Sequence, residues 1–330
     1  MKQATRQSLP VIVVGGALIL APLALGDYQT GQLAQFFTYG IFAMSLALVW
    51  GLGGLLCFGQ AIFFGVGAYA MSVVTLDMMP GLGEYGSSWL GLLAAIALPA
   101  AVANLLGRFL FYGRGLQGAY FGIVTLAIAV IAERLAVNWN WIGGLNGLIN
   151  VPPLNLGATG DGHEIWQALP VYYLTLGVAV LVYAGLQALI GSRYGTVIRA
   201  VRDAEVRTAF FGYDTAGVKL TVFTVGAAVA GLAGALFVTQ FWFVSPTVIG
   251  FGLSTEVLIW VALGGRGYLL AAFLGAIVVK YAEASLFGYL GPYWLLALGA
   301  LFVLSVIYFP RGLFGEAIYR ITGTGQGSSG

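Results

Sequence analysis

The chain has 330 residues, of which 60% are hydrophobic and only 8% are charged, and its formal net charge is +2. Soluble domains carry roughly a quarter charged residues, so this composition excludes an ordinary soluble domain. It indicates a membrane protein with several spans, for which the lipid bilayer is an expected partner and nucleic acid is not.

Apolar segments recur along the whole chain, and helices of about 20 such residues cross a hydrocarbon core of roughly 30 Å. In chain order we predict ten spans, at about 9–25, 33–51, 55–76, 88–112, 118–137, 169–190, 219–243, 253–265, 268–288 and 292–309. The eighth is too short to cross as a plain helix. Barrel strands would alternate apolar and polar residues, whereas "LAAIALPAAVANLL" is apolar on every side. The expected fold class is therefore an all-α polytopic membrane protein.

The basic residues predict how the spans are oriented, because short loops rich in Lys and Arg stay cytoplasmic. With ten crossings and both termini inside, the cytoplasmic segments hold Lys2, Arg6, Arg108, Arg114, Arg193, Arg199, Arg202, Arg207, Lys219, Arg266, Arg311 and Arg320. The charged residues of the outside loops are all acidic: Asp27, Asp77, Glu84, Asp161 and Glu164. This split supports an even number of spans near ten in a bacterial-type inner membrane. The first span resembles a signal peptide, but no small-residue cleavage pattern follows it, so we expect a retained helix.

The chain lacks the residue sets of an intramembrane enzyme. Cys57 is the only cysteine and His163 the only histidine, which excludes an intrachain disulfide and a cysteine zinc site. There is no His-Glu-x-x-His, no Gly-x-Ser-x-Gly and no phosphate-binding Gly-x-x-x-x-Gly-Lys-Ser/Thr loop. We therefore expect no catalytic residue, no metal and no cofactor in this chain.

The longest predicted cytoplasmic loop, about 191–219, holds five basic residues. Val197, Val201 and Ala204 fall at helical spacing on one side, and Arg199, Asp203 and Arg207 on another. This pattern predicts a short amphipathic helix over 196–212. Such a helix could lie on anionic lipid head groups. The interspersed acids favour a docking element for a soluble protein instead.

Five ordered motifs carry a family resemblance. They are "GQAIFFGVGAY" (59–69), "GAYFGIVTLAIAVIAERLAVNW" (118–139), "GGLNGL" (143–148), "GFGLSTEVLIWVALGGRG" (250–267) and "YFPRGLFG" (308–315). Over roughly 35–316 the chain resembles the LivM-type membrane subunits of branched-chain amino-acid ABC importers, a family that also includes urea and short-amide permeases. The resemblance implies a single permease domain over 1–320 that acts as a transport subunit, followed by a flexible tail over 321–330.

The resemblance also implies partners and a docking site. The partners are a second, homologous permease subunit, an extracytoplasmic solute-binding protein, and two cytoplasmic ATPase subunits that bind ATP and Mg. In this family the cytoplasmic loop docks onto an ATPase subunit, and "EVRTAFFGYD" (205–214) is similar to its contact helix. Together with the charge pattern, this gives a docking set of Arg199, Arg202, Asp203, Glu205, Arg207, Ala209 and Gly212.

Ten spans can divide into two halves of five. Because five is an odd number, the second half starts on the opposite side of the membrane and is inverted relative to the first. Spans 3 and 8 then correspond, and both are interrupted by glycines. Interrupted helices at matching positions indicate a transport site near the midplane. The alternative is that these glycines only allow close helix packing.

Polar and aromatic residues within the two interrupted segments give the candidate substrate path: Gln60, Phe63, Phe64, Ser254, Thr255 and Glu256. Gln60 could instead hydrogen bond between helices, and Glu256 could be a solvated carboxylate at a helix start. The two phenylalanines could serve in packing. Lys280 and Glu283, three residues apart, are interpreted as a structural pair, and so is Glu133 beside Arg134.

The function that these observations favour is an ATP-driven importer permease for a small polar or zwitterionic solute, most often a branched-chain or hydrophobic amino acid in this family. Two alternatives stay open. One is a urea or short-amide importer. The other is an ion-coupled secondary carrier, which would need intramembrane carboxylates or histidines for its coupling ion.

Overall fold

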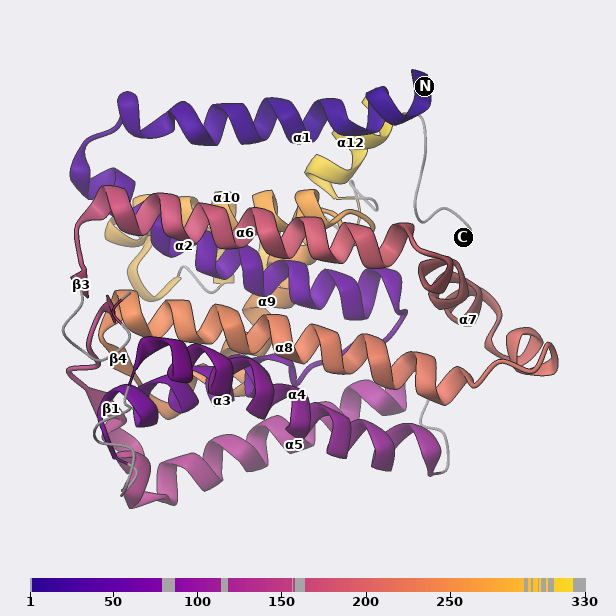
Figure 1. Ribbon diagram of the computed structural model, residues 1–330, viewed down its shortest axis with the longest axis horizontal. Coiled ribbons are helices and arrows are strands. Elements are labelled where there is room, and N and C mark those ends of the chain that lie inside the picture. The colour runs from indigo at the N-terminus through magenta and orange to yellow at the C-terminus, as the bar shows by residue number, and fades with distance from the viewer. Residues whose placement is uncertain are drawn as a thin grey trace. The chain divides into compact units, whose positions relative to one another are not determined.

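The computed structural model describes residues 2–78, 87–113, 118–155, 157, 164–293 and, beyond these, 296–297, 299–301, 303, 307 and 312–322. Long helices dominate this part of the chain (Figure 1). They are α1 (Lys2–Leu20), α2 (Asp27–Leu46), α3 (Gln60–Thr75), α4 (Ser88–Tyr112), α5 (Ala119–Asn138), α6 (Ala168–Gly191), α7 (Arg193–Phe210), α8 (Thr215–Phe241), α9 (Phe251–Gly264), α10 (Leu269–Leu290) and α12 (Leu313–Thr322).

Short elements connect these helices. A π-helix, Ala47–Leu52, continues α2, and 3₁₀ turns lie at Ala21–Leu23, Asn140–Ile142, Gly144–Asn146, Pro246–Val248 and Gly291–Tyr293. The strands have two residues each: β1 (Leu148–Ile149), β2 (Leu154–Asn155), β3 (Glu164–Ile165) and β4 (Phe243–Val244). β1 pairs antiparallel with β4, with Leu148 opposite Val244, and β2 pairs antiparallel with β3, with Leu154 opposite Ile165.

Six of the described helices are long and apolar enough to cross a membrane: Asp27–Leu52, Ser88–Tyr112, Ala119–Asn138, Ala168–Gly191, Thr215–Phe241 and Leu269–Leu286. Three shorter apolar helices, Pro10–Leu23, Gln60–Thr75 and Phe251–Gly264, fall on the first, third and eighth predicted spans. The prediction of an all-helical membrane protein with several spans is confirmed. The tenth predicted span lies largely outside the described residues, as do 323–330 of the predicted tail and the residues Arg114, Glu84, Asp161, His163 and Arg311.

The helix boundaries correct the predicted starts of several spans, including the second, which begins at Asp27 and not at residue 33. The third was expected to begin near residue 55, but the backbone is not helical between the π-helix and Gln60. The seventh was expected from 219, but α8 begins at Thr215, so Lys219 is a buried residue in its second turn and not a loop residue. Asp214 accounts for the earlier start, because its carboxylate accepts a hydrogen bond from the Gly217 N–H and caps the helix.

The described chain forms two compact units. The first comprises 1–47, 167–183 and 257–330. Within it α2 packs on α10, where the ring of Phe273 fills the space beside Gly40 that a side chain would occupy. Phe37 lies between Tyr172 and Phe273, with ring centroids 5.0 and 5.8 Å away. This aromatic contact joins three stretches of sequence into one core.

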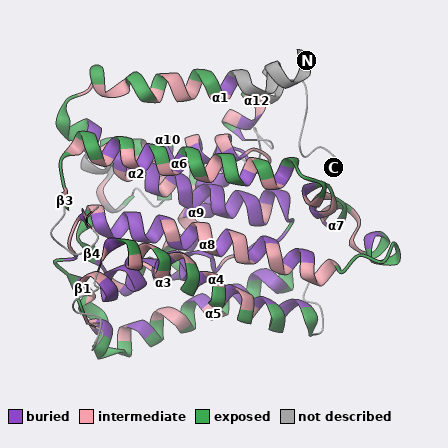
Figure 2. Ribbon diagram, in the orientation of Figure 1, coloured by how far each residue is buried: buried purple, intermediate pink, exposed green. Residues whose placement is uncertain are grey.

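The second unit comprises 48–166 and 184–256, and its centre is the mutual packing of α3, α4 and α8. Glycines allow the close approach. A side chain at Gly67 would collide with the backbone of Gly231, one at Gly231 would collide with the Ala95 carbonyl oxygen, and one at Gly234 would collide with the Phe64 carbonyl oxygen. Accordingly, 67% of the residues in the most apolar stretch of α8 are buried, whereas the share for α5 is 28%. Figure 2 shows the same contrast between the two helices. Helices that expose so much apolar surface are suited to lipid or to a partner subunit.

Candidate functional site

The start of α3 is capped by a side chain from α9. A helix N-terminus leaves backbone N–H groups without partners in the helix, and Gly59 at the cap position has no side chain to offer. Ser254 fills this role, because its hydroxyl oxygen accepts a hydrogen bond from the Ala61 N–H over 3.2 Å. Both residues are fully buried. The two interrupted segments that the sequence singled out are therefore in direct contact.

The remaining candidate path residues lie around this contact. Gln60 is fully buried. Phe63 and Phe64 face α8, where their rings pack on Phe223 and Phe237 at centroid distances of 5.2 and 5.4 Å. These two rings thus have packing partners in the helix interface.

The two path candidates that follow Ser254 are half-buried. The Thr255 hydroxyl donates to the Phe251 carbonyl oxygen one turn earlier, over 2.9 Å, so its hydrogen is used within α9. Glu256 lies one residue further along the same helix. The structure therefore brings Gln60, Ser254 and their neighbours together at one helix junction.

The segment between the π-helix and α3 is held by α5. The Phe58 N–H donates to the Thr125 hydroxyl over 3.1 Å, and a side chain at Gly59 would approach the Thr125 carbonyl oxygen to 2.6 Å. Gly54 has φ of +72°, a left-handed conformation that favours glycine. The buried Cys57 lies within this segment. α5 thus holds this non-helical backbone at Phe58 and Gly59.

One contact of this junction was not predicted from the sequence. The Glu133 carboxylate of α5 lies against Gly250, in the space that a side chain there would occupy, immediately before α9 begins. Glu133 was expected to be structural beside Arg134. Glu133 and Gly250 are far apart in the sequence, and no motif links them. Only the fold shows that they are in contact.

The predicted cytoplasmic helix exists as α7, and Ser192 caps it by accepting a hydrogen bond from the Gly195 N–H. Its predicted apolar side is partly wrong, because Val197 and Ala204 are only half-buried. The buried side is Gly195, Ile198, Val201 and Thr208. The helix is also kinked at Ala204, where φ is −153° and ψ is 71°, so residues beyond it do not continue the face set by those before it.

Three residues of the predicted docking set are bound to other elements of their own chain. Arg202 donates to the Gly51 carbonyl oxygen over 3.0 Å and to the Asp203 carboxylate over 2.8 Å, and Arg199 donates to the Ile190 carbonyl oxygen over 3.3 Å.

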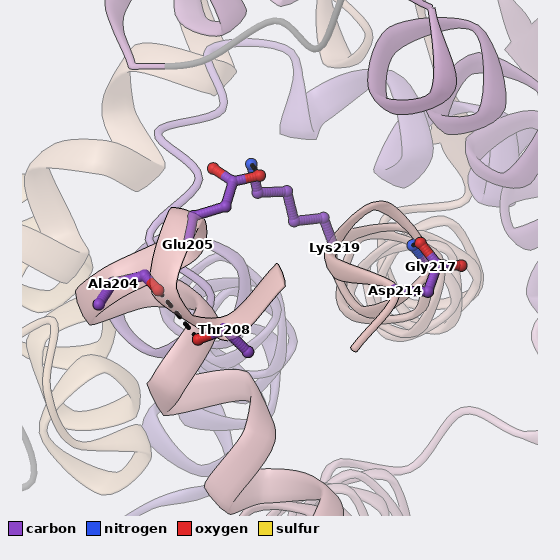
Figure 3. A network of polar contacts seen from close by, with 6 residues as sticks. All are labelled: Ala204, Glu205, Thr208, Asp214, Gly217 and Lys219. Carbon is purple, nitrogen blue, oxygen red and sulfur yellow. Dashed lines mark hydrogen bonds and ion pairs between the residues drawn. The ribbon is translucent and has the colours of Figure 1, made fainter. Parts of the chain in front are cut away.

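The third is Glu205, which forms an ion pair with Lys219 of α8 at 2.5 Å (Figure 3). Figure 3 also shows the Thr208 hydroxyl donating to the Ala204 carbonyl oxygen across the kink, over 2.9 Å. These contacts fasten α7 to the π-helix, α6 and α8.

The other docking candidates, Asp203, Arg207, Ala209 and Gly212, are exposed. Around them the structure exposes four large apolar side chains that the sequence analysis did not single out: Val206, Phe210, Phe211 and Tyr213. Phe210 and Phe211 are 87% and 83% exposed. We call residues 206–213 the α7 tip. An exposed apolar group of this kind beside charged residues is typical of a protein interaction site.

The α7 tip ends at a fixed point. The Asp214 carboxylate accepts hydrogen bonds from the Tyr112 hydroxyl over 2.6 Å and from the Gly217 N–H over 3.0 Å. These hydrogen bonds, the Tyr112 bond first, lower the pKa of Asp214 below its usual value. The tip is thus held on one side by Glu205 and on the other by Asp214.

The candidate residues lie within a region that matches a known family. A family model described as "Branched-chain amino acid transport system / permease component" matches residues 30–306. The chain belongs to this family. It is therefore a membrane permease subunit of a transport system and not an enzyme.

Three relatives show how the permease compares across the family. It is 34% identical over 295 residues to the high-affinity branched-chain amino acid transport system permease protein LivM of Escherichia coli K12, covering 83% of this chain and 67% of the relative. It is 27% identical over 333 residues to a probable LivM of Methanocaldococcus jannaschii, covering 86% and 92%.

The permease is also 25% identical over 292 residues to LivH of Escherichia coli K12, covering 84% and 92%. Thus two kinds of permease protein from one organism both resemble this chain. No solved structure matches it significantly.

Proposed function

We propose that this permease is the LivM-type subunit of an ATP-driven importer of branched-chain and other hydrophobic amino acids. The observation that carries the proposal is the α7 tip, whose exposed apolar side chains are flanked by residues bound to membrane helices at both ends. An importer driven by separate ATPases needs such an element, because the movement of the ATPase subunits must be transmitted to the spans. The similarity to LivM supports the cargo class.

The tip docks into a groove of an ATPase subunit. Phe210 and Phe211 are the anchors, since large aromatic side chains at the centre of an interface supply most of its binding energy. Arg207 and Asp203 lie at the rim, where charges set orientation more than affinity. The alternative, an amphipathic helix resting on lipid, would gain nothing from Asp203.

The solute path passes the α3 and α9 junction. Gln60, Ser254, Thr255 and Glu256 supply its polar groups, and Phe63 and Phe64 form its packed wall. Ten spans in two inverted halves of five would place α3 and α9 at equivalent positions, and the Ser254 cap at the start of α3 supports that pairing.

The assembly contains a second permease subunit, two ATPases that bind ATP and Mg, and an extracytoplasmic binding protein, while this chain itself binds no cofactor. Separate LivM and LivH relatives support a heterodimer of permeases. Both termini lie in the cytoplasm and the complex lies in an inner membrane, as the distribution of basic residues indicates.

Reconstitution tests this function. The permease with its cognate permease, ATPases and leucine-loaded binding protein is placed in proteoliposomes, and we expect radiolabelled leucine uptake that requires ATP inside. Vesicles without ATPases, with an imposed proton gradient, are the control. Uptake driven by that gradient alone would establish a secondary carrier, and uptake of urea without leucine would establish the short-amide alternative.

A further inference from the structure

An ion pair lies in the middle of α10, within the first compact unit. The Lys280 ammonium is 2.7 Å from the Glu283 carboxylate, and the two side chains are 12% and 28% exposed. The same ammonium lies over two aromatic rings, 4.6 Å from the Tyr39 centroid and 5.1 Å from the Trp260 centroid. We call these four residues the α10 cage.

The position of the cage indicates a function. A charged side chain near the centre of a span is costly, and such residues usually mark a solute or ion pathway. A purely structural pair gains little here, because replacing a buried ion pair with apolar residues is often neutral or stabilising. The aromatic rings add a surface that attracts cations, since cation–π contacts strengthen when desolvated.

Trp260 adds an unsatisfied donor to the wall of the cage. Its side chain is fully buried, and its indole N–H has no hydrogen-bond partner within the described part of the chain. Buried indole N–H groups usually find a partner. Tyr39 packs edge-on against this ring at 5.4 Å, so the aromatic walls of the cage support each other.

We propose that the α10 cage is a binding station for the zwitterionic end of the amino-acid cargo. Lys280 binds the cargo carboxylate, and Glu283 binds the cargo ammonium, which also faces the rings of Tyr39 and Trp260. In the empty permease the two charges pair with each other. Cargo replaces that one ion pair with two, so each charge in the membrane keeps a partner of opposite sign throughout.

This inference rests on the proposed function and narrows its cargo. Urea and short amides carry no charged pair, so they offer nothing to exchange with Lys280 and Glu283. An α-amino acid brings both charges on groups that are bonded to the same carbon atom. The station therefore binds the ammonium and carboxylate groups that all amino acids share. Selectivity for the side chain comes from other surfaces and from the binding protein.

The test uses a double variant, Lys280→Met with Glu283→Met, in the full transporter in proteoliposomes. Removing both charges together leaves no lone charge in the span, which spares folding. We expect leucine uptake to fall at least 10-fold while ATPase subunits still co-purify. The matched control is Arg320→Gln with Glu316→Gln, which removes another ion pair of the same unit, one with Arg320 77% exposed; its uptake should not change. Normal uptake by the Met double variant would make the pair structural and overturn the proposal.

A second measurement tests the proposal even if the double Met variant does not assemble. Lys280→Arg keeps the charge but changes the geometry and hydration of the donor. In the purified complex without binding protein, leucine should raise the unfolding temperature, and this variant should need several-fold more leucine for half the shift. An unchanged leucine requirement, or no shift in the wild type, would overturn the station. Absence of ATP-dependent leucine uptake by the wild type would instead overturn the proposed function.

Discussion

Arg202 of α7 donates a hydrogen bond to the backbone carbonyl oxygen of Gly51, 3.0 Å away, at the end of the π-helix that continues α2. Carbonyl groups at a helix end lack partners within the helix, and a cation there also complements the helix dipole. The Arg202 stem lies over Gly54, where a side chain would approach its Cγ to 2.6 Å. α7 is thereby joined to the segment that leads into α3.

The first prediction follows from this bond. Arg202→Met keeps the length of the stem but removes the guanidinium, so the link to Gly51 is lost while the α7 tip is unchanged. We expect ATPase subunits to co-purify normally, ATP hydrolysis to continue, and leucine uptake per ATP to fall several-fold. Arg193→Met, at an exposed position of the same helix and outside the docking set, is the control. Equal coupling in both variants would show that Arg202 has no part in transmission.

The second prediction concerns the α7 tip. Replacing both Phe210 and Phe211 with Ala removes the exposed anchors without disturbing buried residues. Truncation of central anchors costs at least about 2 kcal/mol of binding free energy each, a factor of about 30. Co-purification of the ATPase should therefore be lost, while the permease itself remains folded in detergent. If lipid were the partner, ATPase binding would persist and affinity for anionic vesicles would fall instead.

The third prediction concerns the cap of α3. Ser254→Ala leaves the buried Ala61 N–H without its acceptor. Loss of a serine cap destabilises by roughly 0.5 to 2 kcal/mol, and we expect a lower unfolding temperature together with reduced uptake. Thr255→Ala, whose hydroxyl donates only within its own helix, should be milder in both respects. The idea fails if the two variants are indistinguishable in thermal unfolding.

The fourth prediction uses pH. The Tyr112 and Gly217 hydrogen bonds lower the pKa of Asp214 below 3.8, so the stability that they contribute is fully present above that value and is lost as the pH falls through the folded pKa. Tyr112→Phe removes the larger contribution. The difference in unfolding temperature between wild type and variant should be largest at neutral pH and shrink below about pH 4. Because Asp214 is exposed, the difference will be small, and an unchanged gap at low pH would contradict the assignment.

The sequence was a good guide wherever a property depended on local composition. Long apolar runs predicted α4 and α5 to within a residue or two, because the bilayer demands internal hydrogen bonding of every span. The spacing of the apolar residues Val197, Val201 and Ala204 and of the charges at 199, 203 and 207 predicted a helix in the loop at about 191–219, and ordered motifs predicted the family. The missing catalytic motifs also favoured a transport subunit over an enzyme without any knowledge of the fold.

Contacts between distant segments were decided only by the tertiary structure. The sequence could single out Gln60 and Ser254, but it could not show that Ser254 caps the helix that Gln60 begins. It assigned Arg199, Arg202 and Glu205 to the docking set from their charge pattern and the family resemblance. Only the structure shows that Arg199 and Arg202 donate to the Ile190 and Gly51 carbonyl oxygens and that Glu205 pairs with Lys219, while Phe210 and Phe211 are exposed. A charged side chain is held by whichever opposite charge or orphan carbonyl lies nearest in space, and that distance is set by how the helices pack and not by their order along the chain.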